Sequence, residues 1–224
     1  MGREYLTKIA LSPKAIYEAE FVAVEDFSGS ITHWVNGRGA GWVANKDPKA
    51  AVGGDYGLVL ITQPSAPYVN DNVYFMKPIG LIPSPKACIS ALVRIPTNFG
   101  YSAACIELQL GDPKSLDALD GWARLNGKDK TAEIRTGGAW VSVGSASFLE
   151  ENSTYLFELE IDLIKKEYVR VRIGNHTYDA SGHTLTTVAN YGNEAFIILS
   201  VWSLMTDYRG YGCFANVIAR CLPS

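Results

Sequence analysis

The 224-residue sequence lacks several features that would assign it to a particular class of protein. No apolar run approaches the ~18 residues of a membrane-spanning helix, so no membrane span is expected. The N-terminal stretch MGREYLTKIALSPKAIYEAE has no apolar segment of the kind found in signal peptides, which favours a cytoplasmic location. The formal net charge is only −3 and no basic stripe is present, so nucleic acid is not an expected partner.

Cysteine and histidine are also scarce. The four cysteines are Cys88, Cys105, Cys213 and Cys221, which is few for a disulfide scaffold of this size. We expect buried free thiols, and a Cys88–Cys105 or a Cys213–Cys221 bridge is the alternative. No spacing of cysteine and histidine fits zinc, and no serine or cysteine stands at nucleophile-elbow spacing. Neither a cofactor, a zinc site nor a catalytic triad is therefore expected.

Strong period-two alternation is what the sequence does have, most clearly in residues 154–173. The odd-numbered residues of 155–163 and 169–173 are apolar, whereas most of those between them are polar. This alternation is typical of half-buried antiparallel strands. A shared apolar face requires partners of equal parity, and we predict that Ile161 pairs with Val171.

The polar face of this hairpin carries charges of opposite sign. The same register sets Glu160 opposite Arg172 and Asp162 opposite Arg170, as cross-strand ion pairs. The pattern predicts a solvated outer face. It also predicts a connection of five residues centred on Lys166, because the connection has odd length and contains no glycine.

The rest of the chain contains short segments of the same kind, roughly a dozen strands in all. Five prolines in residues 63–86 predict loop and edge structure there, and residues 112–121 form a polar interruption. A helical piece is expected only near residues 13–19. We predict a single all-β domain over residues 1–224, a two-sheet antiparallel sandwich with residues 1–20 as an N-terminal extension.

Several pieces of the sequence occur in a characteristic order. They are Glu25-Asp26-Phe27, Trp34, Gly53-Gly54, Gly57-Leu58-Val59-Leu60, Leu159–Asp162, Val171–Asn175, Tyr178-Asp179 and Phe214–Val217. Together they resemble the concanavalin A-like lectin/glucanase jelly roll, a superfamily shared by laminin-G-like domains. The resemblance extends from Phe21 to the end of the chain. It implies a jelly-roll fold but no specific family, because one fold hosts many functions.

The resemblance also bears on metal binding. In some related jelly rolls, acids of the first and last strands hold a structural calcium. Glu25 and Asp26 could supply one side of such a site, but Ala215 stands where relatives often have Asp. A structural calcium is the one metal that the resemblance leaves open.

Three acids on one strand face form the first candidate for chemistry. Glu158, Glu160 and Asp162 have the alternate spacing of the acids on the catalytic strand of retaining glucanases in this superfamily. The order of residue types differs, and pairing with Arg170 and Arg172 would keep the carboxylates ionised. We interpret this face as structural and expect any binding site on the opposite sheet.

A polar-aromatic groove is the favoured candidate site. Sugars stack their apolar faces on Trp and Tyr, while polar side chains bind their hydroxyl groups. Alternation places suitable side chains off the core at Glu107, Gln109, Trp122, Arg124, Arg135 and Trp202. The loop DYRGYG adds Tyr208, Arg209 and Tyr211 as a predicted rim. The alternative is that these aromatic residues serve ordinary packing.

Three functions fit these observations. The first is non-catalytic binding of an oligosaccharide or polysaccharide in the groove. The second is a glycoside hydrolase or polysaccharide lyase, for which Glu107 and Glu133 are the acid pair we nominate; an enzyme is the less favoured of the two. The third is a structural, assembly or adhesion role. The sequence leaves the oligomeric state open.

Overall fold

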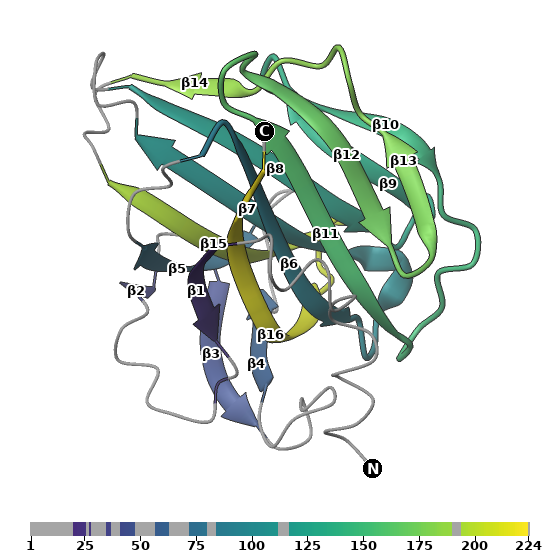
Figure 1. The fold of residues 1–224 in the computed structure, drawn as a ribbon. Helices are drawn as coiled ribbons and strands as arrows, with labels where there is room; N and C mark the ends of the chain where they lie inside the picture. The colour runs from purple at the N-terminus through teal and green to yellow at the C-terminus, as the bar shows by residue number, and fades with distance from the viewer. Residues whose placement is uncertain are drawn as a thin grey trace.

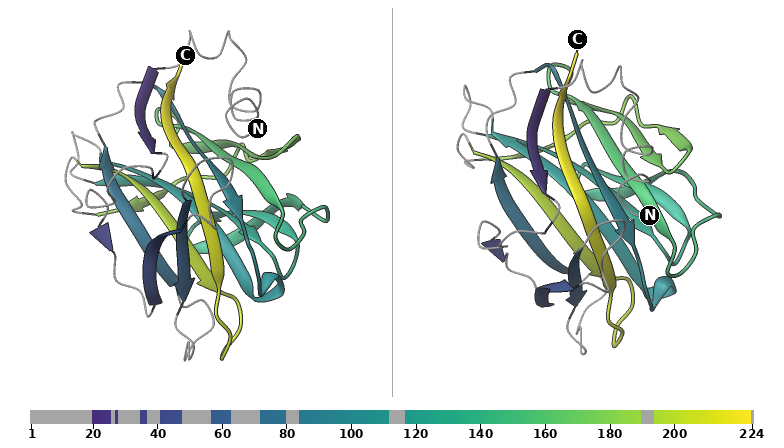
Figure 2. Two further views of the ribbon diagram at one scale, coloured as in Figure 1. Left: turned by 90° about the horizontal axis from the view of Figure 1, so that it is seen from below. Right: turned by 60° about the horizontal axis from the view of Figure 1, so that its bottom comes forward.

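The structure is a computed structural model, and it describes residues 20–25, 27, 35–36, 41–47, 57–62, 72–79, 84–111, 117–189 and 194–223. Most of these residues lie in antiparallel strands, which form two sheets packed face to face (Figures 1 and 2). The predicted all-β sandwich is therefore confirmed. No described helix is long and apolar enough to cross a bilayer.

The first sheet, sheet A, contains the hairpin that dominates the sequence. In spatial order its strands are β13 (His176–Asp179), β12 (Glu167–Ile173), β11 (Thr154–Asp162), β6 (Lys86–Arg94), β16 (Tyr211–Leu222), β4 (Gly57–Thr62) and β3 (Gly41–Asp47). Strand β1 (Glu20–Glu25) also pairs with β16, so the first and last of the described strands lie side by side.

The second sheet, sheet B, lies on the other side of the core. In spatial order its strands are β10 (Ala139–Ser145), β9 (Thr131–Thr136), β8 (Ala118–Asn126), β7 (Ser102–Gly111), β15 (Ala195–Ser203), β5 (Asn72–Ile79) and β2 (Val35–Asn36). The short strand β14 (Thr186–Val188) pairs with the first part of β8. A 3-10 turn, η3 (Phe99–Tyr101), precedes β7.

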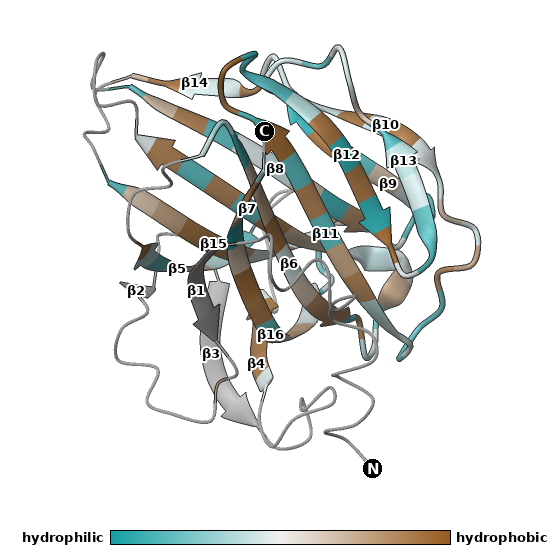
Figure 3. Ribbon diagram, viewed as in Figure 1, coloured by the Kyte–Doolittle hydropathy of each residue, from teal (hydrophilic) through white to brown (hydrophobic). Residues whose placement is uncertain are grey.

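The core forms where the apolar sets of the two sheets meet. Leu159 and Ile161 of β11 and Ile106 and Leu108 of β7 are fully buried in one continuous cluster. Brown and teal segments alternate along β11 and β12 in Figure 3, as a strand with one face in the core requires. Burial of each such side chain contributes ~1.5–3 kcal/mol to folding, so the alternation determines which face of each strand points inward.

The β11–β12 hairpin keeps the predicted parity only from Phe157 to Glu160, and its register differs from the predicted one. Leu159 lies opposite Val171, and Ile161 lies opposite Tyr168 beyond a bulge that follows Glu160. The predicted pairing of Ile161 with Val171 is therefore wrong. Val171 pairs with Leu159 instead, two residues earlier in β11. A shift of two positions keeps every apolar side chain on the same face, so parity alone does not exclude it.

The connection of this hairpin explains the shift. It contains four residues, 163–166, rather than five. Lys166 adopts the left-handed conformation, with φ 57°, that the prediction reserved for glycine. Asp162 Oδ1 accepts the backbone N–H groups of Ile164 and Lys165 at 3.0 and 2.9 Å. This side-chain cap stabilises a tighter turn than the spacing predicted.

The acidic face of β11 is buried, so the predicted solvated face is a second correction. Glu158, Glu160 and Asp162 are only 4%, 7% and 8% exposed. Arg220 Nη2 lies 2.6 Å from a Glu158 carboxylate oxygen, and Arg170 Nε lies 2.8 Å from one of Glu160. These ion pairs offset part of the free energy that burial of the carboxylates costs.

Two segments also contain more strand than was predicted. The proline-rich stretch 63–86 includes β5, in which Pro78 lies beyond the two residues that pair with β2 and therefore needs no donor on that side. The polar interruption 112–121 ends early, because β8 begins at Ala118.

The remaining predictions concern the cysteines and the N-terminal part of the chain. The four cysteines are buried thiols, as expected. The N-terminal helical piece and Trp34 lie outside the described residues. Asp26 and the side chain of Glu25 do as well, so the calcium site stays a prediction.

Candidate functional site

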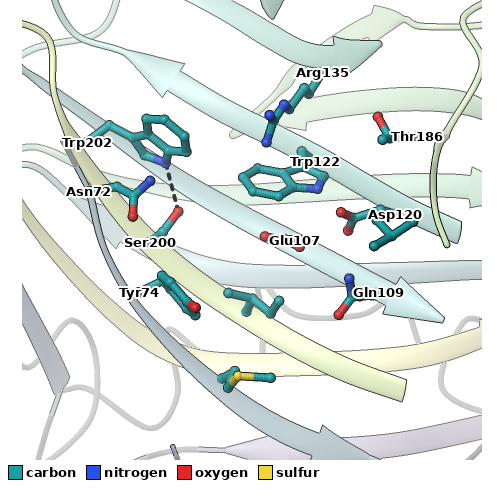
Figure 4. A pocket seen from close by; sticks show the side chains of 13 residues that line it. Asn72, Tyr74, Glu107, Gln109, Asp120, Trp122, Arg135, Thr186, Ser200 and Trp202 are labelled. Carbon is teal, nitrogen blue, oxygen red and sulfur yellow. Dashed lines mark hydrogen bonds between the residues drawn. The ribbon is translucent and has the colours of Figure 1, made fainter. Parts of the chain in front are cut away.

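A cavity of about 360 Å³ lies on the face of sheet B that points away from the core (Figure 4). Its volume is at the lower end of the range usual for small-molecule sites, ~300–1,000 Å³. We call it the sheet-B cavity. It is lined by Asn72, Tyr74, Met76, Glu107, Gln109, Asp120, Trp122, Arg135, Thr186, Val188, Ile198, Ser200 and Trp202.

Strand register brings these residues together. Glu107 lies opposite Trp122 on one neighbouring strand and opposite Ile198 on the other. Gln109 lies opposite Asp120 in the same way. Directly paired residues point to the same face of a sheet, so the side chains form rows across the strands. The cavity extends from β9 to β5, four strand spacings or roughly 19 Å at ~4.8 Å each.

Most of the strand residues predicted for the groove line this cavity. They are Glu107, Gln109, Trp122, Arg135 and Trp202. Arg124 occupies the same face but is buried beside the cavity, where its guanidinium lies 4.1 Å from the centre of the Trp140 ring and pairs with Glu133. Arg124 therefore supports the wall without lining it.

Glu133, which we nominated as the acidic partner of Glu107, does not line the cavity. Its carboxylate accepts bonds from Arg124, from Asn126 Nδ2 at 2.9 Å and from Thr131 Oγ1 at 2.9 Å. The Glu133 carboxylate is therefore occupied by hydrogen bonds to residues of β8 and β9. The carboxyl group that lies beside Glu107 in the cavity is instead that of Asp120 (Figure 4).

The predicted aromatic rim lies elsewhere. Tyr208 is 42% exposed and stacks on Tyr101, with ring centroids 4.1 Å apart. The carbonyl oxygen of Arg209 accepts a bond from Asn98 Nδ2 at 3.2 Å. Tyr211 begins β16 of sheet A. None of the three predicted rim residues is among those that line the cavity.

Sequence reasoning missed Asp120 and Thr186. Asp120 was assigned to a polar interruption, yet Asp120, Trp122 and Arg124 alternate in the same way as the recognised strands. Extending that alternation toward the N-terminus would have found it. Thr186 comes from a three-residue strand with no recognisable pattern of its own. No local signal marks it.

Three tryptophans pack together at the site, and two of them, Trp122 and Trp202, line the cavity. The rings of Trp122, Trp140 and Trp202 meet edge to face, with centroids 5.7–6.1 Å apart. The guanidinium of Arg135 lies 4.5 Å from the centre of the Trp122 ring. Edge-to-face and cation–π contacts of this kind hold the rings in defined orientations. Trp202 Nε1 donates to Ser200 Oγ at 3.0 Å, which further orients this ring (Figure 4).

A tyrosine of the opposite sheet supports the cavity wall from beneath. The β8–β9 ladder ends at the Ala123–Ile134 pair, so Trp122 and Arg135 would form the next pair. Instead, the Tyr168 hydroxyl accepts the backbone N–H of Trp122 at 3.0 Å and donates to the carbonyl of Arg135 at 2.6 Å. Tyr168 thus stands between the two strands and sets the spacing of two cavity residues.

The two cavity carboxyl groups are electrostatically unusual. Burial, followed by the charge of Asp120, raises the pKa of Glu107 well above its ordinary value. Burial also raises the pKa of Asp120, although Glu107, Trp122 and Arg135 favour its ionised form. Two adjacent carboxyl groups with little access to water hold a proton more tightly than isolated ones. The pair therefore keeps a proton to higher pH than isolated carboxyl groups do, and the protonated pair can both donate and accept hydrogen bonds.

Several buried polar atoms of the cavity wall have no hydrogen-bond partner of good geometry within the described part of the chain. They are Gln109 Oε1, Asp120 Oδ1, Trp122 Nε1 and Thr186 Oγ1. Buried polar atoms are nearly always paired in folded proteins. Four such atoms therefore gather at this cavity, where a bound molecule can reach them.

Comparison with known proteins identifies the fold. No family model matches the sequence, and no curated protein matches it. Among solved structures, a sialidase superposes with a TM-score of 0.54 at 14% identity over 91% of this chain, which corresponds to only 19% of that protein.

Two further structures match over nearly their whole length. The lectin UEA-II complexed with galactose has a TM-score of 0.54 at 8% identity, over 91% of this chain and 100% of the lectin. A glycoside hydrolase family 16 endo-glucanase from Bacteroides ovatus has a TM-score of 0.50 at 14% identity, over 88% and 99%. Identities this low show the fold alone. The chain has the two-sheet jelly-roll fold of these structures, which is the fold that the sequence resemblance implies, without assignment to a specific family.

Proposed function

We propose that the sheet-B cavity binds an oligosaccharide or a segment of polysaccharide without cleaving it. The observation that carries the proposal is the composition of the cavity wall, where two indole rings stand beside buried polar atoms that the fold leaves unpartnered. Sugars present apolar ring faces and a dense set of hydroxyl groups, and this wall matches both. The similarity in fold to a galactose-bound lectin supports the proposal.

The division of labour follows from the positions of the side chains. Trp202, Ile198 and Met76 offer apolar surface on which the face of a sugar ring can lie. The polar groups of Gln109 and Asp120 lie toward the other end (Figure 4). Both sets belong to rigid neighbouring strands, so binding would require little ordering of the protein.

A glycan array followed by calorimetry tests the proposal. Trp202→Ala should weaken binding of any sugar ligand by about tenfold or more, because a buried aromatic contact contributes ~1.4 kcal/mol or more at a binding hot spot. Tyr208→Ala is the matched control, since this exposed aromatic residue does not line the cavity and its loss should leave affinity unchanged. Absence of binding to every polysaccharide at millimolar concentration would overturn the proposal.

A second candidate, glycoside hydrolysis, is favoured by the pairing of Glu107 with Asp120. A general acid needs a raised pKa, which burial and the neighbouring carboxyl give Glu107. In such a reaction Glu107 would give its proton to the glycosidic oxygen as that bond breaks. The Asp120 carboxylate would take a proton from the attacking water, or attack the sugar itself.

The two candidates separate in one assay. Hydrolysis predicts new reducing ends from a polysaccharide that the protein binds, and loss of that activity in both Glu107→Gln and Asp120→Asn. Pure binding predicts no new reducing ends from the wild-type protein. The fold similarity to an endo-glucanase makes β-glucan the first substrate to test.

A further inference from the structure

The four unpartnered polar atoms of the sheet-B cavity lie together at one of its ends. Gln109 on β7, Asp120 on β8 and Thr186 on β14 are directly opposite one another in consecutive strands, so they form a row across the sheet. Trp122 follows Asp120 by two residues and points to the same face. Figure 4 shows Gln109, Asp120 and Thr186 on the side of the cavity away from Trp202, with the Trp122 ring between them and Trp202.

The opposite end is different, because its polar groups are satisfied. Trp202 Nε1 is bonded to Ser200 Oγ at 3.0 Å, which leaves the indole ring as a surface for stacking. Trp122 has the same N–H group without a partner of good geometry. The two tryptophans therefore offer a ligand different things: Trp202 a ring face, and Trp122 a hydrogen-bond donor.

The unpartnered atoms destabilise the folded state. Gln109 and Asp120 are only 4% and 3% exposed, and a buried polar atom without a partner lowers the stability of the folded state. None of the four atoms holds strands together through a hydrogen bond of its own. Their number and convergence indicate that a bound molecule supplies the partners.

The chemistry of the row specifies that molecule. Gln109 Oε1 and Asp120 Oδ1 accept hydrogen bonds, Trp122 Nε1 donates one, and Thr186 Oγ1 does either. Two adjacent hydroxyl groups, each both donor and acceptor, match this set. A carboxylate matches it less well, because it would face the carboxyl groups of Asp120 and Glu107.

We infer that the β7–β8–β14 end of the cavity is a subsite that recognises two adjacent hydroxyl groups of a single neutral pyranose unit, with Trp202 stacking on the rest of the ligand. The inference rests on the proposed function and adds the orientation of the ligand and the class of the sugar unit at this end. It assigns Gln109, Asp120, Trp122 and Thr186 to recognition rather than to folding.

Nuclear magnetic resonance with defined sugars tests the subsite. The probes are methyl β-glucopyranoside, methyl β-galactopyranoside and cellotetraose, added to the full ¹⁵N-labelled chain. At least one should shift the Trp122 indole N–H resonance strongly, since this group gains a hydrogen-bond partner of good geometry. The Trp202 indole N–H, already bonded to Ser200, should move less. Trp122→Phe and Trp202→Phe assign the two resonances.

Substitutions provide the second readout. Thr186→Val and Gln109→Met should each weaken binding about three- to tenfold, the equivalent of one hydrogen bond of ~0.5–1.5 kcal/mol. Both should leave the melting temperature unchanged or raise it, because each removes an unpartnered polar atom. Thr187→Val is the matched control: Thr187 neighbours Thr186 on β14 but is exposed on the other face, so affinity should not change.

The outcomes separate this inference from the proposed function. If sugars bind and Trp202→Ala weakens them, but Thr186→Val and Gln109→Met match the Thr187→Val control, the subsite is refuted while sugar binding stands. A clear loss of thermal stability in Thr186→Val and Gln109→Met would also refute it, since that would indicate a structural role. If none of the three probes shifts any cavity resonance and the array finds no ligand, both proposals fail.

Discussion

Replacing Tyr168 with phenylalanine tests how the two sheets cooperate to build the cavity. The hydroxyl of this residue is the only part removed, and it forms two hydrogen bonds in the core, at 3.0 Å to the Trp122 N–H and at 2.6 Å to the Arg135 carbonyl. Tyr168 itself is 1% exposed. The variant leaves both peptide groups without their partner, beneath two residues that line the cavity.

The expected loss of stability follows from these two bonds. A buried peptide group left unpaired costs ~1–3 kcal/mol. Part of this is recovered if β8 and β9 move together and form the direct N–H···O bond that the hydroxyl now replaces. We therefore expect Tyr168→Phe to lower the free energy of unfolding by about 2 kcal/mol. For a domain of this size the melting temperature should fall by ~4–8 °C.

Urea unfolding followed by tryptophan fluorescence measures this loss, and calorimetry with a bound sugar measures the change at the cavity. The control is Tyr178→Phe, in which the hydroxyl removed makes a single exposed bond to the Ser145 carbonyl at 3.0 Å. The control should lose less than ~1 kcal/mol and keep its affinity. If Tyr168→Phe and Tyr178→Phe are indistinguishable in both measurements, the hydroxyl of Tyr168 does not set the spacing of the strands.

Three further predictions concern charge and backbone conformation. Because burial and the charge of Asp120 raise the pKa of Glu107 above 4.5, its stabilising contribution is complete below about pH 4.5 and is lost as pH rises through the raised value. Glu107→Gln should therefore raise the melting temperature at neutral pH and change it little near pH 4; an equal effect at both would contradict the raised pKa. Arg220→Met should lower the free energy of unfolding in urea by ~3 kcal/mol or more, because it leaves Glu158 buried without its ion-pair partner. Arg170→Met removes a half-exposed arginine from Glu160 and should lower it by ~1 kcal/mol or less. Lys166→Gly should stabilise by about 0.5–1 kcal/mol, since φ is +57° there; unchanged or lower stability would mean that the turn favours lysine for another reason.

The errors of sequence reasoning had a common cause. The hairpin register was wrong by two positions because a shift of two preserves the inward and outward faces, which are all that alternation specifies. The choice was made by the Asp162 cap and the left-handed Lys166. The acids of β11 were expected in water and are buried, because Arg220 reaches Glu158 from a position 62 residues further along the chain.

The candidate site was partly predictable for the same reason. Glu107, Gln109 and Trp202 could be assigned to the outward face of their strands from local alternation, and all three line the cavity. The rim residues and Glu133 could not be excluded from it, since their positions depend on contacts with Asn98, Tyr101 and Arg124 rather than on pattern. Asp120 was missed because strand β8 was predicted too short.

The sequence by itself determined the two-sheet sandwich and the inward or outward direction of most strand residues, because both follow from the period of two and from burial of apolar surface. Only the tertiary structure decided which strands are neighbours, and therefore which outward-facing side chains lie together. Strands β7 and β15 lie side by side although some 90 residues separate Glu107 from Ile198, and β14 joins β8 at Asp120. Pairing between distant strands is selected by the packing of the whole core. That packing, with the Tyr168 hydroxyl between β8 and β9, turns separate alternating strands into one cavity.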